Sequence, residues 1–390
     1  MIDIKDKKDC SGCAACASIC GHGCIAMGTD SEGFPYPEVD PSACVNCGLC
    51  DRTCPMINIP EGNNISKVYA AKNRNYAERL RSSSGGVFRL LATRIINQGG
   101  IVVGCRFDDK MVAHHTIAHT KDEIEPLMSS KYVQSDTREI FAQVRDRLRK
   151  GDKVLFSGVP CQVAAIKNYL LKPYDNLITV DILCHGVPSP KIFKEYIDLL
   201  TERYHSDPSA VNFRSKEKSW KRLYLKVLFR NGLKHFLYAG YDSYMQLFLS
   251  DRLQRPSCFH CPYNTLHRPG DISLGDFWGI GKKFYSFDDN RGVSMVLINN
   301  AAGKALWESV ADQAIVIESD IKTAIAGNRV LVAHLPDQSK RDRFYQTYTS
   351  EGLPSAISKY APETSRRSQI YHNIMRRGLD LLRKITHKSY

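Results

Sequence analysis

The chain has 390 residues, of which 43% are hydrophobic and 24% are charged, and its formal net charge is +13. This composition is typical of a soluble globular protein, and the length exceeds that of one average domain. No apolar run approaches membrane-spanning length, and the N-terminus lacks the apolar core of a signal peptide. We therefore expect a cytoplasmic protein of more than one domain. The positive charge admits nucleic acid as a partner, but no nucleic-acid motif accompanies it, so we expect no nucleic acid.

Two cysteine runs with the same spacing occupy the first 60 residues. They are Cys10-x2-Cys13-x2-Cys16-x3-Cys20 and Cys44-x2-Cys47-x2-Cys50-x3-Cys54-Pro55. This spacing is that of a bacterial-type ferredoxin with two 4Fe-4S clusters, in which the fourth cysteine of each run ligates the other cluster. The runs therefore predict a first cluster on Cys10, Cys13, Cys16 and Cys54, and a second cluster on Cys44, Cys47, Cys50 and Cys20.

Zinc is the alternative occupant of these runs, because paired C-x2-C elements also hold structural zinc. A triple repeat followed by x3-Cys, present twice, is more than a zinc site requires. One irregularity is Gly21, which stands where proline would follow the first run, and another is the extra cysteine Cys24. We interpret Cys24 as a buried free thiol, with a role as an alternative ligand as the second interpretation.

After a linker at residues 60–66, the hydrophobic pattern alternates between helical and strand periods. Helices are expected at 87–98, 140–148, 162–171 and 190–204, where Ser189 and Pro190 supply an N-cap and a first-turn proline. Strands are expected at 101–107, 154–157 and 177–183, and Asn231-Gly232 predicts a hairpin between 222–230 and 233–238. We expect a mixed α/β (α+β) domain, with parallel units early and a hairpin later.

Four more cysteines fall at strand ends or in loops of this second domain: Cys161, Cys184 and the pair Cys258-x2-Cys261. Cys161 and Cys184 follow expected parallel strands, whose carboxyl ends share one rim of a sheet, so they could be neighbours in space. With the pair they would supply four thiolates for a third 4Fe-4S cluster. Two unrelated buried cysteines and a structural turn are the alternative. Cys105 lies inside a strand pattern and is expected to be core.

Five motifs follow one another in order between residues 68 and 280: Ser83-Ser-Gly-Gly, Lys131-Tyr-Val-Gln-Ser, Ser157-Gly-Val-Pro-Cys-Gln, Cys184-His-Gly-Val-Pro-Ser and Asp271-Ile-Ser-Leu-Gly-Asp-Phe-Trp-Gly. In these motifs the chain resembles the beta-subunit family of coenzyme F(420) hydrogenase and dehydrogenase. The resemblance implies a domain that binds FAD, holds its own 4Fe-4S cluster and passes electrons between iron-sulfur centres and a soluble hydride carrier. It favours the third cluster, but it does not fix the substrate.

The residues themselves also suit a flavin. Ser82-Ser-Ser-Gly-Gly precedes an expected helix, where free N-H groups and close backbone approach suit a pyrophosphate. A plain serine N-cap is the alternative. His185, beside Cys184, is a candidate proton donor, or else it fills a supporting or turn position. No G-x-G-x-x-G fingerprint indicates a separate NAD domain.

The expected flavin contacts lie in the motifs of the resemblance. They are Ser83, Ser84, Gly85, Gly86, Lys131, Tyr132, Gln134, Gly158, Asp276, Phe277 and Trp278. Lys131 could neutralise a phosphate or the reduced flavin, or it could simply be solvated. The alternative for Asp276, Phe277 and Trp278 is ordinary core near a strand end.

Residues 336–390 are expected to form a basic helical tail, after domains at 1–60 and 67–335. Its apolar stripe is Ile370, Tyr371, Ile374, Leu381, Leu382 and Ile385, set among arginines and lysines. Such a helix could lie on an anionic membrane as a peripheral contact or dock an acidic partner. A solvated helix packed on its own domain is the alternative.

The combined expectation is an iron-sulfur flavoprotein oxidoreductase. It would move electrons between ferredoxin-type clusters, FAD and a soluble hydride carrier, either a deazaflavin or a nicotinamide, or an organic substrate. Its partner would be that carrier or a redox protein. The alternative from another class is a non-catalytic electron-transfer adaptor subunit of a larger redox complex, and the resemblance adds surface polysaccharide biosynthesis as one setting.

Overall fold

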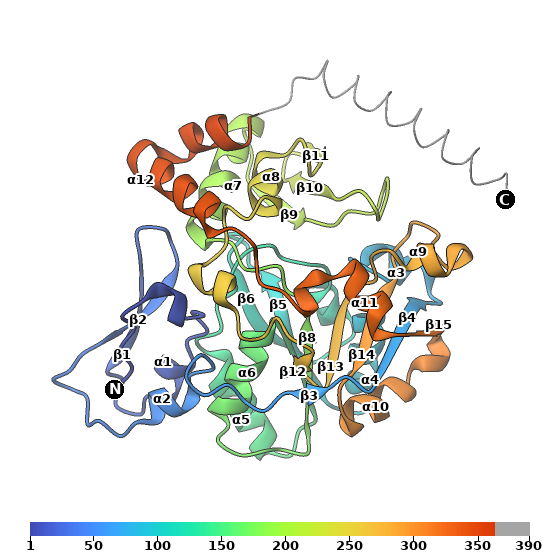
Figure 1. Ribbon diagram of the computed structural model, residues 1–390, viewed down its shortest axis with the longest axis horizontal. Coiled ribbons are helices and arrows are strands. Elements are labelled where there is room, and N and C mark those ends of the chain that lie inside the picture. Colours follow the sequence, from blue (N-terminus) through green and yellow to red (C-terminus); the bar gives the residue numbers. More distant parts are fainter. Residues whose placement is uncertain (363–390) are drawn as a thin grey trace.

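A computed structural model describes residues 1–362, and its centre is an eight-stranded mixed sheet in the order β15-β4-β14-β13-β8-β7-β5-β6 (Figure 1). The strands β5, β7, β8 and β13 run parallel to their neighbours within this block, and the outer pairs are antiparallel. The carboxyl ends of four strands therefore meet at one rim. The strands are β4 (Lys67–Asn73), β5 (Ile101–Phe107), β6 (Ala113–Ala118), β7 (Val154–Gly158), β8 (Leu177–Ile182), β13 (Ile272–Asp276), β14 (Ser294–Ile298) and β15 (Ala314–Ser319).

Helices cover both faces of this sheet, because alternate residues of its inner strands are apolar on opposite sides. Val102 and Leu155 pack with α4 and α10, whereas Val103 and Phe156 pack with α5 and α6. The helices of this domain are α3 (Tyr76–Arg81), α4 (Val87–Asn97), α5 (Ile140–Arg149), α6 (Pro160–Tyr169), α9 (Ile280–Lys283), α10 (Ala301–Glu308) and α11 (Ile321–Gly327).

The helices and strands expected from periodicity are confirmed close to their expected bounds. The Ser189 hydroxyl accepts from the amide of Ile192, and Pro190 is the first residue of its helix, as expected. The helix expected at 162–171 begins two residues earlier, because Pro160 occupies its first turn and the Gln162 side chain accepts from the amide of Val159. The expected mixed α/β class is therefore confirmed.

A second layer combines a three-stranded sheet with three helices (Figure 1). Its elements are β9 (Pro208–Asn212), β10 (Tyr224–Phe229), β11 (Lys234–Tyr238), α7 (Pro190–Tyr204), α8 (Ser243–Leu249) and α12 (Gln338–Tyr360). Phe344 and Tyr345 of α12 are buried in one apolar cluster with Phe193 and Phe248. The expectation of a separate tail from residue 336 is therefore wrong over α12, which belongs to the core. The apolar stripe expected at 370–385 lies outside the described residues.

The N-terminal domain lies beside α5 and α6 and holds the β1 (Ile25–Thr29) and β2 (Pro35–Val39) hairpin with the short helices α1 (Ala15–Ile19) and α2 (Leu49–Thr53) (Figure 1). Fully buried Arg255 fastens it by donating to the carbonyls of Cys10 at 2.6 Å and Pro35 at 2.9 Å. A short pair, β3 (Asn63–Asn64) with β12 (His267–Arg268), ties the linker to the second domain. Over the described range, no helix combines the length and apolarity needed to cross a membrane.

Candidate functional site

Cys10, Cys13, Cys16 and Cys54 come together on the side of the N-terminal domain that faces the large sheet. All four are buried, and the Thr137 hydroxyl of the second domain donates to the Cys13 carbonyl at 2.7 Å. Burial, helped by the neighbouring Cys54 and Cys10 thiols, raises the pKa of the Cys13 thiol to about 12. Burial, followed by neighbouring thiols of the same set, also raises the pKa of Cys16. The structure thus assembles the set expected to hold the first cluster.

The second set lines a small cavity of about 20 Å³ at the outer end of the domain. Its walls include Cys20, Cys44, Cys47 and Cys50, and Cys47 is exposed. Cys24 lines the same cavity, with its Sγ 3.3 Å from the Sγ of Cys20. Cys24 is buried and free, as expected, and it stands among the expected ligands of the second cluster, so its second interpretation as an alternative ligand stays open.

The four cysteines of the second domain also converge. Cys161 follows β7, Cys184 follows β8, and the Cys258–Cys261 loop lies close to both: the Cys161 thiol interacts electrostatically with the other three. Burial, the largest cause, raises the pKa of every thiol in this set, and that of Cys258 reaches about 12. Cys161 also interacts with Cys13 of the N-terminal domain. The first and third sets are therefore neighbours across the domain boundary.

Ligation of one ion is a different arrangement from ligation of a cluster. In residues 1–362, no group of three or more His, Cys, Asp or Glu side chains is placed to hold a single metal ion. Zinc needs four ligands around one ion, whereas a 4Fe-4S cluster carries each thiolate on a different iron, so its ligands stand further apart.

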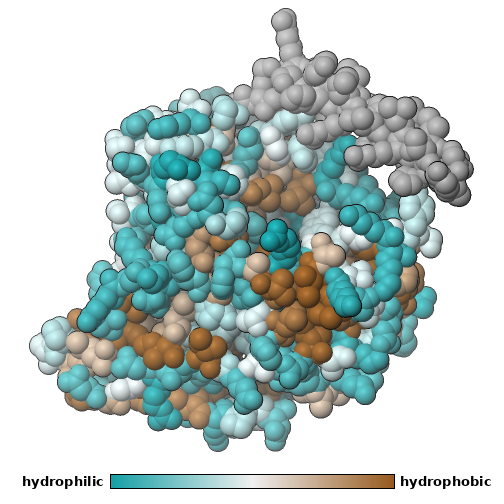
Figure 2. Space-filling view, in the orientation of Figure 1, coloured by the Kyte–Doolittle hydropathy of each residue, from teal (hydrophilic) through white to brown (hydrophobic). Residues whose placement is uncertain are grey.

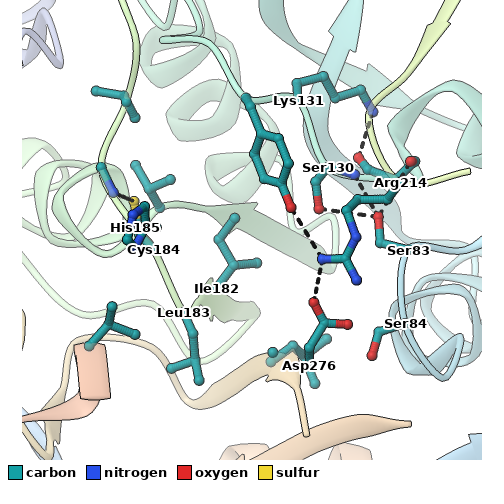
Figure 3. A pocket seen from close by; sticks show the side chains of 18 of the residues that line it. Ser83, Ser84, Ser130, Lys131, Ile182, Leu183, Cys184, His185, Arg214 and Asp276 are labelled. Atoms are coloured by element: carbon teal, nitrogen blue, oxygen red, sulfur yellow. Dashed lines mark hydrogen bonds and ion pairs between the residues drawn. The ribbon is translucent and has the colours of Figure 1, made fainter. Parts of the chain in front are cut away.

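A cavity of about 790 Å³ opens along the carboxyl ends of the parallel strands, within the size range of cofactor pockets. Gly158 of β7 and Asp276 of β13 line it. Cys184 stands on one side of the cavity and Ser83 on the opposite side (Figure 3). Cys105 lines it as well, so its expected core position is only partly correct. The pocket thus has a wall in common with the third cysteine set.

The Ser83 end of the pocket is formed by the start of α4. Gly86, with φ of +88°, is the N-cap of α4, and no side chain caps this helix, so the serine N-cap is not found. Ser83 Oγ accepts from the amide of Ser130 at 2.7 Å, and Ser84 Oγ donates to the Val293 carbonyl at 2.8 Å. The first N-H groups of α4 therefore remain available to an anion, and Gly86 and Val87 line the pocket.

Arg214 is a pocket residue that sequence reasoning missed. Its Nη1 donates to the carboxylate of Asp276 and to the Tyr132 hydroxyl, and its guanidinium lies 5.2 Å from the ring centroid of Trp278 (Figure 3). The side chain is 4% exposed, and within residues 1–362 its buried Nη2 has no hydrogen-bond partner. Arg214 lies in none of the five sequence motifs, and it meets the motif residue Asp276 only in the folded chain.

Three expected flavin contacts are placed differently from expectation. Gln134 turns away from the pocket, and its Nε2 donates to the carbonyls of Ser11 and Gly12 at the domain boundary. Phe277 is fully buried in an apolar core cluster. These two assignments are wrong, because packing and domain docking occupy the side chains. Gly85 borders the loop without lining the cavity, and a Cβ there would lie 2.2 Å from the Ala71 carbonyl oxygen.

Lys131 lines the pocket, but its ammonium group is already engaged. Nζ donates to the backbone carbonyls of Pro126, Met128 and Ser129 at 2.8, 2.7 and 3.1 Å. Burial lowers its pKa to about 8. Lys131 is therefore neither solvated nor free for a phosphate, and it holds the 126–129 turn against the pocket.

His185 and His115 line the pocket in different ways. His185 Nε2 lies 2.8 Å from Asp251 Oδ1, and Asp251 adopts a left-handed backbone with φ of +62°. His115 Nε2 donates to the Ser157 carbonyl at 3.1 Å, and its Nδ1 accepts from the Ser135 hydroxyl at 3.1 Å. Burial lowers the pKa of His115 to about 4, so this imidazole is neutral at pH 7.

Two family models match the chain. The model for the C terminus of the beta subunit of coenzyme F420 hydrogenase/dehydrogenase matches residues 151–324, and the model described as "4Fe-4S dicluster domain" matches residues 9–57. The two matches fall on the second domain and on the cysteine-rich N-terminal domain, respectively. The resemblance inferred from the five motifs and the ferredoxin spacing is therefore confirmed.

Similar proteins extend this comparison. The F component of the F(420)H(2) dehydrogenase of Methanosarcina mazei is 23% identical over 324 residues, or 79% of this chain and 84% of that protein. The 7Fe ferredoxin of Hydrogenibacillus schlegelii is 30% identical over 69 residues, or 17% of this chain and 82% of that protein. A chain of the F420-reducing NiFe hydrogenase complex from Methanosarcina barkeri has a TM-score of 0.45 at 17% identity, covering 77% of this chain and 92% of that chain. The present chain is an iron-sulfur electron-transfer protein in which a 4Fe-4S dicluster domain precedes a domain of the coenzyme F420 hydrogenase/dehydrogenase beta-subunit family.

Proposed function

We propose that the chain is an iron-sulfur flavoprotein oxidoreductase. Its pocket would bind FAD, and Cys161, Cys184, Cys258 and Cys261 would hold a third 4Fe-4S cluster. One observation carries the proposal: Cys184 lines the pocket and also belongs to the third cysteine set, which reaches Cys13 on its other side. The thiol sets and the pocket thus form a continuous series.

The series has one end at the surface. Cys47 of the second set is exposed, as are Val45, Ile57 and Ile59 of the same domain, and apolar side chains are visible over this domain in Figure 2. The first set is buried against the sheet domain. We infer that the second set would hold the cluster that faces a redox partner, and that the first and third sets would hold the clusters that connect it to the pocket.

The pocket residues fit a dinucleotide cofactor in one orientation. The uncapped start of α4 and the Arg214 Nη2, which has no partner among the described residues, would hold the pyrophosphate, since both offer donors to an anion. Ile182, Leu183 and Cys184 lie toward the other end of the pocket (Figure 3) and would surround the flavin ring. FAD, when bound, supplies the exchange between one-electron and two-electron transfer.

His185 is the proton-carrying group that the pocket offers at the Cys184 end. Asp251 fixes its Nε2, which leaves Nδ1 as the nitrogen available for proton exchange. Its side chain is 41% exposed, so the imidazole can also exchange protons with water. His185 thereby connects the cluster end of the pocket to solvent.

A soluble hydride carrier is the proposed second substrate. The name of the similar F(420)H(2) dehydrogenase favours a deazaflavin, and a nicotinamide is the second possibility. The adaptor alternative gives no role to a 790 Å³ pocket that borders a cysteine set. Anaerobic titration with NADH, NADPH and reduced deazaflavin identifies the carrier as the compound that bleaches the flavin band.

The proposal is tested by removing one ligand of the third set. Cys258→Ala should remove about four of about twelve irons, stop electron flow from the ferredoxin clusters to the flavin, and leave flavin reduction by the hydride donor intact. Ser257→Ala is the matched control, because Ser257 is a buried neighbour without a thiol. Normal iron content and normal cluster-to-flavin transfer in Cys258→Ala would refute the third cluster.

A further inference from the structure

One hydrogen bond joins the ligand loops of two different cysteine sets. The hydroxyl of Tyr263 donates to the Pro55 carbonyl at 2.6 Å. Pro55 directly follows Cys54 of the first set, and Tyr263 follows Cys261 of the third set by two residues. Tyr263 is 2% exposed, so both the ring and the hydrogen bond are buried at the domain boundary.

The hydroxyl of Tyr263 lies near thiols of both sets. Four thiols lie close enough to the Tyr263 hydroxyl to act on it electrostatically, two from the third set and two from the first: Cys161, Cys261, Cys13 and Cys54. Tyr263 therefore borders both sets, beside the point where Cys161 and Cys13 approach each other. Interior packing also leaves few gaps in such a position, so the ring excludes water from it.

The main chain at Tyr263 is held by Arg268 of the second domain. Arg268 is almost fully buried, pairs with Asp181 and donates from Nη1 to the Tyr263 carbonyl at 3.0 Å. The same nitrogen lies 3.4 Å from the Thr265 carbonyl. Tyr263 is therefore fixed at its main chain by the sheet domain and at its hydroxyl by the N-terminal domain.

Two other buried residues, Gln134 and Arg255, also form hydrogen bonds across this boundary. Gln134 donates to the carbonyls of Ser11 and Gly12, and Arg255 donates to that of Cys10. Gln134 thus contacts the loop of the first set, whereas Arg255, whose own carbonyl accepts from the amide of Cys258, also connects the first set to the third. Tyr263 adds a second connection on the other side of both loops, from the loop after Cys261 to the loop after Cys54.

We propose that Tyr263 is a positioning residue that holds the first cluster in place against the third. The inference rests on the proposed function, since it assumes a cluster on each set. One electron at a time leaves one cluster and arrives at the other. Tyr263 keeps its proton and its hydrogen bond throughout, so the transfer needs no further reactant.

The test uses the full chain with all cofactors and two variants. Tyr263→Phe removes the hydroxyl and keeps the ring, and Tyr263→Leu removes the ring as well. Tyr345→Phe is the matched control, because Tyr345 is also buried and donates to a backbone carbonyl, that of Leu253, at 3.1 Å. Iron, flavin, the rate of first-to-third cluster transfer and their magnetic coupling by electron paramagnetic resonance are measured in each protein.

The expected result is wild-type iron and flavin content in both Phe variants. Transfer should slow measurably in Tyr263→Phe and by roughly tenfold or more in Tyr263→Leu, since small displacements of reacting groups are costly in rate. The magnetic coupling should weaken in the same order and stay unchanged in Tyr345→Phe. Full iron content with wild-type transfer and coupling in Tyr263→Phe would overturn the inference. A wild-type protein with only the ferredoxin irons would instead overturn the proposed function.

Discussion

Arg214 donates through one nitrogen to the carboxylate of Asp276, while its second terminal nitrogen is buried in the pocket wall without a partner among residues 1–362. A buried charged donor of this kind is costly to leave unsatisfied. Asp276 is itself fixed by the indole N-H of Trp220 at 2.9 Å, so the guanidinium has a single orientation. The free nitrogen is therefore prepared for an acceptor on a ligand.

Replacing this arginine should weaken the binding of FAD. Arg214→Gln removes a charge-assisted donor, which is worth about 1.5 to 3 kcal/mol, or roughly tenfold to a hundredfold in the dissociation constant. Flavin fluorescence after stepwise dilution measures this constant. The iron content should remain that of the wild type, because Arg214 contacts none of the cysteines.

Arg230→Gln is the control for that variant, because Arg230 is exposed on the second layer. It should bind FAD as the wild type does. An unchanged dissociation constant in Arg214→Gln would show that the free nitrogen faces another group and that the cofactor orientation proposed above is incorrect.

The fifth thiol of the N-terminal domain should affect the second cluster. Because the Cys24 and Cys20 sulfurs are 3.3 Å apart, Cys24→Ala changes the immediate surroundings of an expected ligand. We expect altered g-values of the second cluster by electron paramagnetic resonance, with the signal of the first cluster unchanged. Cys105→Ala, remote from this cavity, is the control. Identical spectra for Cys24→Ala and wild type would show that Cys24 serves packing alone.

Much of the fold could be predicted because local signals and packing agree. The Ser189-Pro190 helix start depends on contacts within four residues, and it is present as expected. The rim shared by Cys161 and Cys184 follows from the parallel order of β7 and β8. Such features need no knowledge of distant partners.

The predictions that are wrong or missing concern side chains whose contacts lie on a distant segment of the chain. Gln134 lies in a recognisable motif, but a motif does not tell which neighbour the amide meets, and here it is the loop at Ser11. The apolar side of α12 has partners in α7 and α8, so a helix expected to be a separate tail is part of the core. The role of Arg214 could not be predicted from the sequence because its partner Asp276 is 62 residues away along the chain.

The neutral state of His115 predicts a pH dependence of stability. Its pKa is lowered by burial to about 4 in the folded chain from 6.5, so between these values the unfolded chain binds more protons. Stability should therefore fall as the pH drops from 6.5 toward 4, by up to about 3 kcal/mol from this residue. Thermal unfolding at pH 7 and pH 5 measures the fall. In His115→Gln, the unfolding temperatures at pH 7 and pH 5 should differ by less than in the wild type. An equal difference would contradict the neutral state of the buried His115.

Arg255 should be essential for docking of the N-terminal domain. Arg255→Met leaves the carbonyls of Cys10 and Pro35 without a buried charged donor, which should cost at least about 3 kcal/mol. Limited proteolysis between the two domains should accelerate accordingly. Arg81→Gln is the control, since its pair with Glu125 is exposed and exposed pairs contribute little. Equal cleavage rates for both variants would show that other contacts hold the domain.

The most direct test of the account is the iron and flavin content of anaerobically prepared wild-type protein. Twelve cysteines sort into three sets of four, and the third set borders the pocket. The account predicts about twelve irons and one FAD per chain. About eight irons with no flavin would contradict it, leaving a two-cluster ferredoxin attached to a domain with a different task.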